Sequence, residues 1–165
     1  MLLSIMPPLM LDRPGGRVHF WFLGAVMIRS ITYDEGLAVG HEAIDSQHRE
    51  WVTVANQLLA TTDPGAASED FTAALLHLIR YTRHHFATEE GLMEEWAYPR
   101  LEHQRRAHAQ IMADLSASID DRAPAHQAAI LIRETLERWI VEHLLQEDLL
   151  LRDFLRSRSG PTEHC

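Results

Sequence analysis

Cysteine is almost absent from this sequence: the only one, Cys165, is its last residue. The chain therefore has no internal disulfide, no thiolate zinc site and no cysteine-ligated cluster. Any metal ion must be held by nitrogen and oxygen ligands. A chain with so little cysteine suits a reducing compartment, and we expect a cytoplasmic protein.

Long apolar runs and basic surfaces are missing as well. No stretch reaches the roughly 18 apolar residues of a membrane-spanning helix, so we expect no membrane span. The 165 residues include 15 Lys and Arg against 24 Asp and Glu, and the net charge of −9 argues against a nucleic-acid partner. With 8 Gly, 7 Pro and 46% apolar residues, the composition is that of one globular domain.

Apolar residues recur every three or four positions in four segments, which predicts four helices. Asp45 is a suitable N-cap for the first, which ends near residue 61, and the second spans residues 68–95. Pro99 opens a third helix that ends near residue 120, and Pro124 opens a fourth that ends near residue 154. Short connections favour an all-α, up-down-up-down four-helix bundle.

The predicted bundle occupies residues 27–156 and begins with an extended arm over residues 27–44. Residues 1–26 contain Pro-Pro and Pro-Gly-Gly breaks and lack the basic leading region of a signal peptide. We expect them to be a disordered or spurious extension. Residues 157–165 form a polar tail.

Each predicted helix places a histidine on its inward stripe, and two helices add a carboxylate. A lone histidine on an apolar face is usually a hydrogen-bonded core residue, but burying this whole set without a metal would be costly. Four imidazoles and two carboxylates suit a pair of first-row metal ions, above all iron, although zinc or manganese is also compatible. The predicted ligands are His48, His85, Glu89, His108, His143 and Asp148.

His143 and Asp148 are five residues apart, so an ideal helix would rotate them by about 140°. They converge if the two side chains approach from opposite sides, or if a local bulge alters the helix.

The chain resembles bacterial hemerythrins over residues 31–154. The resemblance rests on Asp45-x-x-His48, on His85-Phe86-x-x-Glu89-Glu90, on Tyr98-Pro99 and on His143 through Asp148. It implies a non-haem di-iron centre that binds dioxygen reversibly, with five histidines, one glutamate and one aspartate as ligands. By this resemblance His48 and His85 serve one iron, His108 and His143 serve the other, and Glu89 and Asp148 bridge them.

One position departs from the family pattern. The fifth histidine is expected four residues before His108, where this chain has Gln104. Gln104 would bind iron through its amide oxygen, hydrogen-bond a coordinated water, or leave an open position that admits other small ligands. Alternatively, a bulge would bring in His103, which lies about 100° further round the helix. We expect an altered but intact two-iron site.

The expected function is non-enzymatic dioxygen binding by a monomer, for carriage, storage, delivery or sensing, with any oxygen-using partner protein unidentified. An apolar pocket would exclude bulk water from the irons, although its residues also serve as core. Because of Gln104, two alternatives stay open: a di-iron or mono-iron enzyme acting on peroxide or nitric oxide, and iron storage or sensing. The predicted pocket residues are Trp51, Phe86, Trp139, Ile140 and Leu144.

We predict that Met27 is the natural first residue, because it opens a segment that continues directly into the first helix. Mass spectrometry of the endogenous protein should then find no peptide from residues 1–26. An intact peptide from that region would refute the prediction.

Overall fold

A computed structural model describes residues 9–13, 16–20, 30–62, 68–119 and 125–158. In chain order, its elements are β1 (Leu9–Arg13), β2 (Gly16–Phe20), the 3-10 helix η1 (Glu35–Leu37), α1 (Glu42–Ala60), α2 (Ser68–Glu95), α3 (Leu101–Ala117), α4 (Ala125–Arg138), the π-helix η2 (Trp139–Asp148) and α5 (Leu149–Arg158).

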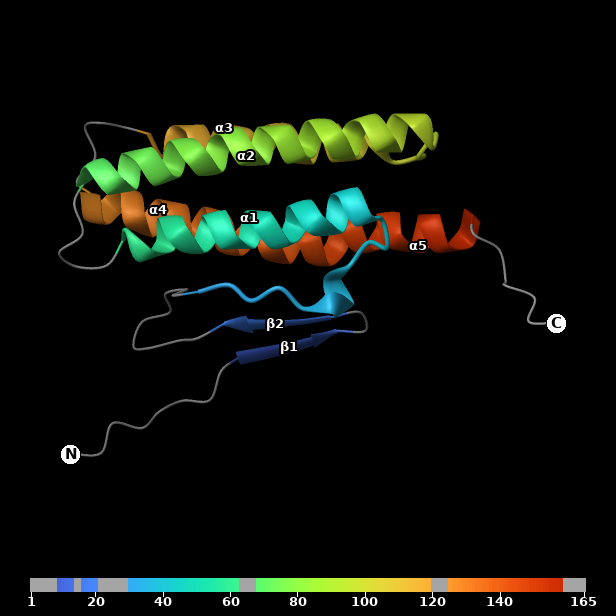
Figure 1. Ribbon diagram of the computed structural model, residues 1–165, viewed down its shortest axis with the longest axis horizontal. Coiled ribbons are helices and arrows are strands. Elements are labelled where there is room, and N and C mark those ends of the chain that lie inside the picture. The colour runs from blue at the N-terminus through green and yellow to red at the C-terminus, as the bar shows by residue number, and fades with distance from the viewer. Residues whose placement is uncertain (1–8, 14–15, 21–29, 63–67, 120–124, 159–165) are drawn as a thin grey trace.

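The helices form the predicted bundle (Figure 1). Helix α2 packs against α1 and α3, while α4 packs against both α3 and α1, so that the ring of four closes. Because α4, η2 and α5 follow one another without a break, they act as one long fourth helix. The all-α, up-down-up-down expectation is therefore confirmed.

The first helix begins earlier than predicted, because Asp45 is not its N-cap. The N-cap is His41, and Asp45 lies in the first turn of α1. Its carboxylate reaches back and accepts hydrogen bonds from the backbone N–H groups of Val39, at 2.6 Å, and Gly40, at 2.9 Å. Asp45 therefore ties the entering chain to the helix, and Gly40 supplies the positive φ of 92° needed for the turn.

A π-helix interrupts the fourth helix over Trp139–Asp148. Its hydrogen bonds join residues five apart, so a spacing of five returns nearly to the same face. His143 and Asp148 have this spacing. Of the two explanations for their convergence, the structure shows the local change in helix geometry.

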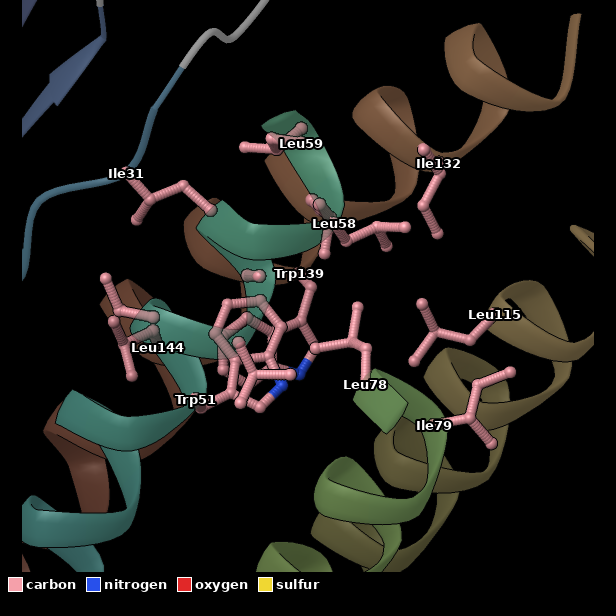
Figure 2. Close-up of a cluster of buried hydrophobic side chains, with 14 of the residues drawn as sticks. Ile31, Trp51, Leu58, Leu59, Leu78, Ile79, Leu115, Ile132, Trp139 and Leu144 are labelled. Atoms are coloured by element: carbon pink, nitrogen blue, oxygen red, sulfur yellow. The ribbon is translucent and has the colours of Figure 1, made fainter. Parts of the chain in front are cut away.

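Two hydrophobic clusters fill the bundle. The main core includes Trp51, Phe86 and Leu145, and the end core includes Ile44, Met93 and Leu151. Figure 2 shows the main core around Trp51 and Trp139, whose rings stack with centroids 3.7 Å apart. Burial of such large aromatic surfaces supplies much of the hydrophobic stabilisation of a bundle this size.

The segment before α1 contributes Ile31 and Leu37 to the main core and Val39 to the end core. Within residues 1–26, where we expected a disordered or spurious extension, β1 and β2 form an antiparallel pair. That Met27 is the natural first residue stays a prediction. The arm that follows is fastened to α1 by Asn56, which accepts a hydrogen bond from the Ile31 N–H and donates one to the Ile31 carbonyl, both at 2.8 Å. In the described part of the chain, no helix has the length and apolar character needed to cross a bilayer.

Helix α2 ends with a residue in an unfavourable backbone conformation. Ala97 has a φ of 51°, and the Tyr98 N–H bonds to the Met93 carbonyl at 2.8 Å, as in a Schellman C-cap. Glycine is the usual residue at such a position, because a Cβ is disfavoured at positive φ.

We predict that Ala97→Gly raises the free energy of unfolding by about 0.5–1 kcal/mol, because it relieves this strain. Chemical denaturation would measure the change. The matched control is Ala73→Gly, at an exposed position inside α2, which should lower the free energy by about 1 kcal/mol. Equal effects of the two substitutions would contradict the prediction.

Candidate metal centre

The structure brings all six predicted ligands together inside the bundle. His48 comes from α1, His85 and Glu89 from α2, and His108 from α3, while His143 and Asp148 come from η2. All are at most 2% exposed. Along each of three helical segments, a ligand falls between the two clusters: His48 between Ile44 and Trp51, Glu89 between Phe86 and Met93, Asp148 between Leu145 and Leu151.

The ligand atoms fall into two groups, each gathered within 4.8 Å. One consists of Glu89, His108 and His143, and the other of His48, Glu89 and Asp148. Glu89 belongs to both. The ring of His85 lies beside that of His48, with centroids 4.7 Å apart, which adds a fourth imidazole.

Asp148 faces both halves with different oxygens. Its Oδ1 lies 3.3 Å from His143 Nε2, and its Oδ2 lies 3.4 Å from His48 Nε2. A carboxylate that divides its oxygens in this way is placed to bridge two metal ions.

The polar atoms at the centre are not satisfied by protein groups. Among the residues that the structure describes, neither the carboxylate oxygens of Glu89 and Asp148 nor His85 Nε2 find a hydrogen-bond partner of normal geometry. His108 Nε2 and His143 Nε2 approach to 3.1 Å. Buried carboxylates are stable only when paired or bound to a cation, so this donor set fits metal ions.

Two further side chains orient the imidazoles. His108 Nδ1 donates to Glu90 Oε1 at 2.7 Å, since a carboxylate can only accept. His85 Nδ1 lies 3.2 Å from Gln47 Oε1, and the amide nitrogen of Gln47 donates to Thr88 Oγ1. A proton on Nδ1 leaves the lone pair of Nε2 available to a metal ion.

The surroundings favour the neutral form of three of the four imidazoles. Burial lowers the pKa of His48, and burial with repulsion from neighbouring imidazoles holds the pKa values of His85 and His143 well below the usual range. Burial also disfavours protonated His108, but Glu89 and Glu90 outweigh it and raise the pKa of that ring.

The pKa of Asp148 shifts in the opposite direction, upward. Burial, followed by repulsion from Glu89, raises the pKa of its carboxyl well above the ordinary value. A cation between the two carboxylates would reverse this shift. Metal ligation needs neutral imidazoles and ionised carboxylates. His48, His85 and His143 are ready for it, and a cation would favour the ligating forms of His108 and Asp148.

Gln104 and His103 occupy different environments. Gln104 is fully buried, and its amide lies close enough to Asp148 to offset a small part of the rise in the pKa of that carboxyl. His103 is not brought to the centre: its side chain is 48% exposed and its Nε2 lies 3.2 Å from Glu147 Oε1. Helix α3 has no bulge that would bring His103 inward, and the altered helix geometry lies in η2.

Two of the five predicted pocket residues lie against rings of the centre. Phe86 stacks on the His108 ring with centroids 3.8 Å apart, and Trp139 lies 5.7 Å from the His143 ring. Trp51 and Leu144 are buried in the same main core. The side chain of Ile140 lies outside the described residues.

A family model for the hemerythrin HHE cation-binding domain matches residues 39–155. The chain belongs to the hemerythrin family. The matched range contains every residue of the centre, so the hemerythrin resemblance seen in the sequence is confirmed and the bundle is a cation-binding domain.

Curated relatives agree with this assignment. The chain is 32% identical to the bacteriohemerythrin of Ralstonia nicotianae over 134 residues, which cover 79% of this chain and 92% of that protein. It is 27% identical to the bacteriohemerythrin of Stenotrophomonas maltophilia, over 77% of this chain and 82% of that protein. For the bacteriohemerythrin of Campylobacter jejuni the identity is 23%, over 72% of this chain and 90% of that protein.

Sequence reasoning missed the roles of Gln47 and Glu90. Each directly precedes or follows a predicted ligand, and on an ideal helix that neighbour points about 100° away from the ligand face. Their partners lie on other helices, so sequence spacing alone carried no signal for these contacts. A search for polar residues flanking each predicted ligand would have listed both.

We predict that Glu90→Ala lowers metal affinity about 10- to 100-fold, because it removes the acceptor that orients His108. Competition with a chromophoric chelator would measure the affinity. The matched control is Glu94→Ala, which removes a carboxylate 69% exposed and paired with Arg105. Indistinguishable metal affinities of the two variants would show that Glu90 does not support the centre.

Proposed function

We propose that this hemerythrin-family chain binds dioxygen reversibly at a non-haem di-iron centre. One observation carries the proposal: two buried carboxylates lie between pairs of imidazoles, and each carboxylate is shared by both halves. Such sharing suits two metal ions better than one. The name bacteriohemerythrin, borne by the relatives, supports iron and dioxygen in particular.

In this proposal His48 and His85 hold one iron, and His108 and His143 hold the other. Glu89 and Asp148 would be shared by both irons, and the irons would supply the electrons and the binding position for dioxygen. The protein orients the ligating side chains and excludes bulk water from the irons. Gln47 and Glu90 hold two imidazoles in place. Trp51, Phe86, Trp139, Leu144 and, in the proposal, Ile140 keep bulk water from the centre.

The proposed protein carries or stores dioxygen rather than transforming a substrate. Gln104 leaves an enzymatic alternative open, because a weaker metal donor than histidine at that position would let peroxide or nitric oxide bind to the metal. A binder releases dioxygen unchanged when the oxygen pressure falls. An enzyme consumes peroxide or nitric oxide over many turnovers, so the two functions are separable by product analysis.

We predict that the anaerobically reduced protein contains two irons per chain and takes up dioxygen reversibly. Elemental analysis and repeated cycles of oxygenation and degassing, followed by absorption spectroscopy, would test this. Glu89→Gln should lose most of the iron, because a neutral amide replaces the carboxylate common to both groups.

The matched control is Glu95→Gln, an exposed position on the same helix, which should retain iron and oxygen binding. Two irons with peroxide turnover and no recoverable dioxygen would favour the enzyme. Unchanged iron content in Glu89→Gln would refute the bridging role.

A further inference from the structure

The contact between Gln47 of α1 and His85 of α2 depends on which way round the Gln47 amide lies. Its oxygen, Oε1, is 3.2 Å from His85 Nδ1, and its nitrogen, Nε2, is 3.2 Å from Thr88 Oγ1, on the next turn of α2. An amide oxygen only accepts hydrogen bonds and an amide nitrogen only donates them. With Oε1 toward the ring, Nδ1 of His85 therefore carries the proton, whereas a reversed amide would require the proton on Nε2.

The position of this proton decides whether His85 is ready to bind a cation. Its Nε2 is buried and has no hydrogen-bond partner among the described residues, and the ring lies beside that of His48. A neutral imidazole binds a metal ion through the nitrogen that lacks a proton. The tautomer with the proton on Nδ1 is thus ready for a cation, and the other tautomer must first rearrange.

The hydroxyl of Thr88 favours one direction of the amide. It donates to the His84 carbonyl, one helical turn earlier, at 3.1 Å. A hydroxyl has a single proton to donate, so its oxygen is left to accept from Gln47 Nε2. The same Nε2 lies 3.4 Å from the ring nitrogen Nε2 of His84, which also accepts when that ring carries its proton on Nδ1. Acceptors on this side hold the amide nitrogen there and leave Oε1 for His85.

A second threonine of α2 has the same arrangement with a donor of unambiguous direction. Thr82 Oγ1 donates to the Leu78 carbonyl at 2.8 Å and receives a hydrogen bond from Trp51 Nε1 at 2.9 Å. An indole nitrogen only donates, so this hydroxyl oxygen must accept. Both threonines are bonded to the carbonyl four residues before them, and each takes an N–H from α1. A threonine held in this way is an acceptor directed at the neighbouring helix.

The backbone of Gln47 is fixed against α2 as well. Tyr81 Oη donates to the Gln47 carbonyl at 3.2 Å. Because the backbone is held here, a half-turn of the amide about its last bond exchanges Oε1 and Nε2 without otherwise moving the side chain. The choice between the two directions is therefore left to the groups that face the amide.

We propose that Thr88 is a positioning residue of the metal centre: through the amide of Gln47 it holds His85 in the tautomer whose Nε2 is free to bind a cation. This role rests on the proposed function, because it serves the proposed centre. The position of the proton, however, is a property of the metal-free protein and is measurable without any bound metal.

Nitrogen-15 NMR of the metal-free protein at pH 8 distinguishes the tautomers, because protonated and unprotonated ring nitrogens differ in chemical shift. We expect the wild-type His85 ring to carry its proton on Nδ1. Thr88→Val removes the hydroxyl and keeps the shape, so a large fraction of molecules should carry the His85 proton on Nε2 instead. Thr88→Ser keeps the hydroxyl and should restore the wild-type tautomer.

Metal affinity gives a second readout. Iron(II), bound anaerobically in competition with a chromophoric chelator, should bind Thr88→Val about tenfold more weakly than wild type, since the ring loses its outer support. The matched control is Thr53→Val on α1. The exposed Thr53 hydroxyl also donates to the carbonyl four residues before it, that of Arg49, at 3.1 Å. Its loss should change neither the tautomer nor the affinity.

Circular dichroism would confirm that each variant is folded, and Thr88→Ala, which also lacks the hydroxyl, would replace an unfolded Thr88→Val. A His85 proton that stays on Nδ1 without the Thr88 hydroxyl would overturn the inference and leave the metal centre standing. Equal effects of Thr88→Val and Thr53→Val, or an unchanged iron affinity despite a moved proton, would overturn it as well. Failure of wild type to bind iron would instead overturn the proposed centre and the inference with it.

Discussion

The burial of Glu89 and Asp148 among four imidazoles is the constraint on which the rest of this structure depends. Among the described residues, neither carboxylate finds a hydrogen-bond partner of normal geometry, and both are 0% exposed. Their burial would cost several kcal/mol in a bundle with no cation. Hydrophobic packing supplies the compensating stability. The main core and the end core lie on either side of the ligands along the helices, so the costly groups are held between two well-packed layers.

A change in helix geometry makes the shared carboxylate possible. With the regular spacing of an α-helix, His143 and Asp148 would point in different directions, and Asp148 could not face both His143 and His48. The π-helix brings them to one face. Because such segments are rare and less stable than α-helix, their presence at functional residues is expected. The packing of Trp139 on Trp51 and the burial of Leu144 stabilise this segment.

Outer contacts distinguish the four imidazoles. Nδ1 of His85 is hydrogen-bonded to Gln47, and Nδ1 of His108 is hydrogen-bonded to Glu90. In both cases the partner lies on another helix. Among the described residues, Nδ1 of His48 and Nδ1 of His143 have no hydrogen-bond partner, and His143 also borders a solvent pocket. Gln104 stands where the family pattern has a histidine, although the domain belongs to a cation-binding family. A family pattern and a departure from it thus coexist in one fold, because the bundle is stabilised by its cores and not by any single ligand.

The sequence alone determined the helices, their order and the six residues of the candidate centre, because helical periodicity and the spacing of potential ligands are both local properties of the chain. Residues 68–95 were predicted as a helix and form α2, and His85 with Glu89 share one face as their spacing requires. The start of α1 was mispredicted because Asp45 bonds to the preceding turn instead of capping the helix. Tertiary structure decided the π-helix, the surface position of His103, the contacts of Gln47 and Glu90, and the pocket at His143. Each depends on which side chains from other helices lie opposite, and residue spacing within one helix carries no record of that.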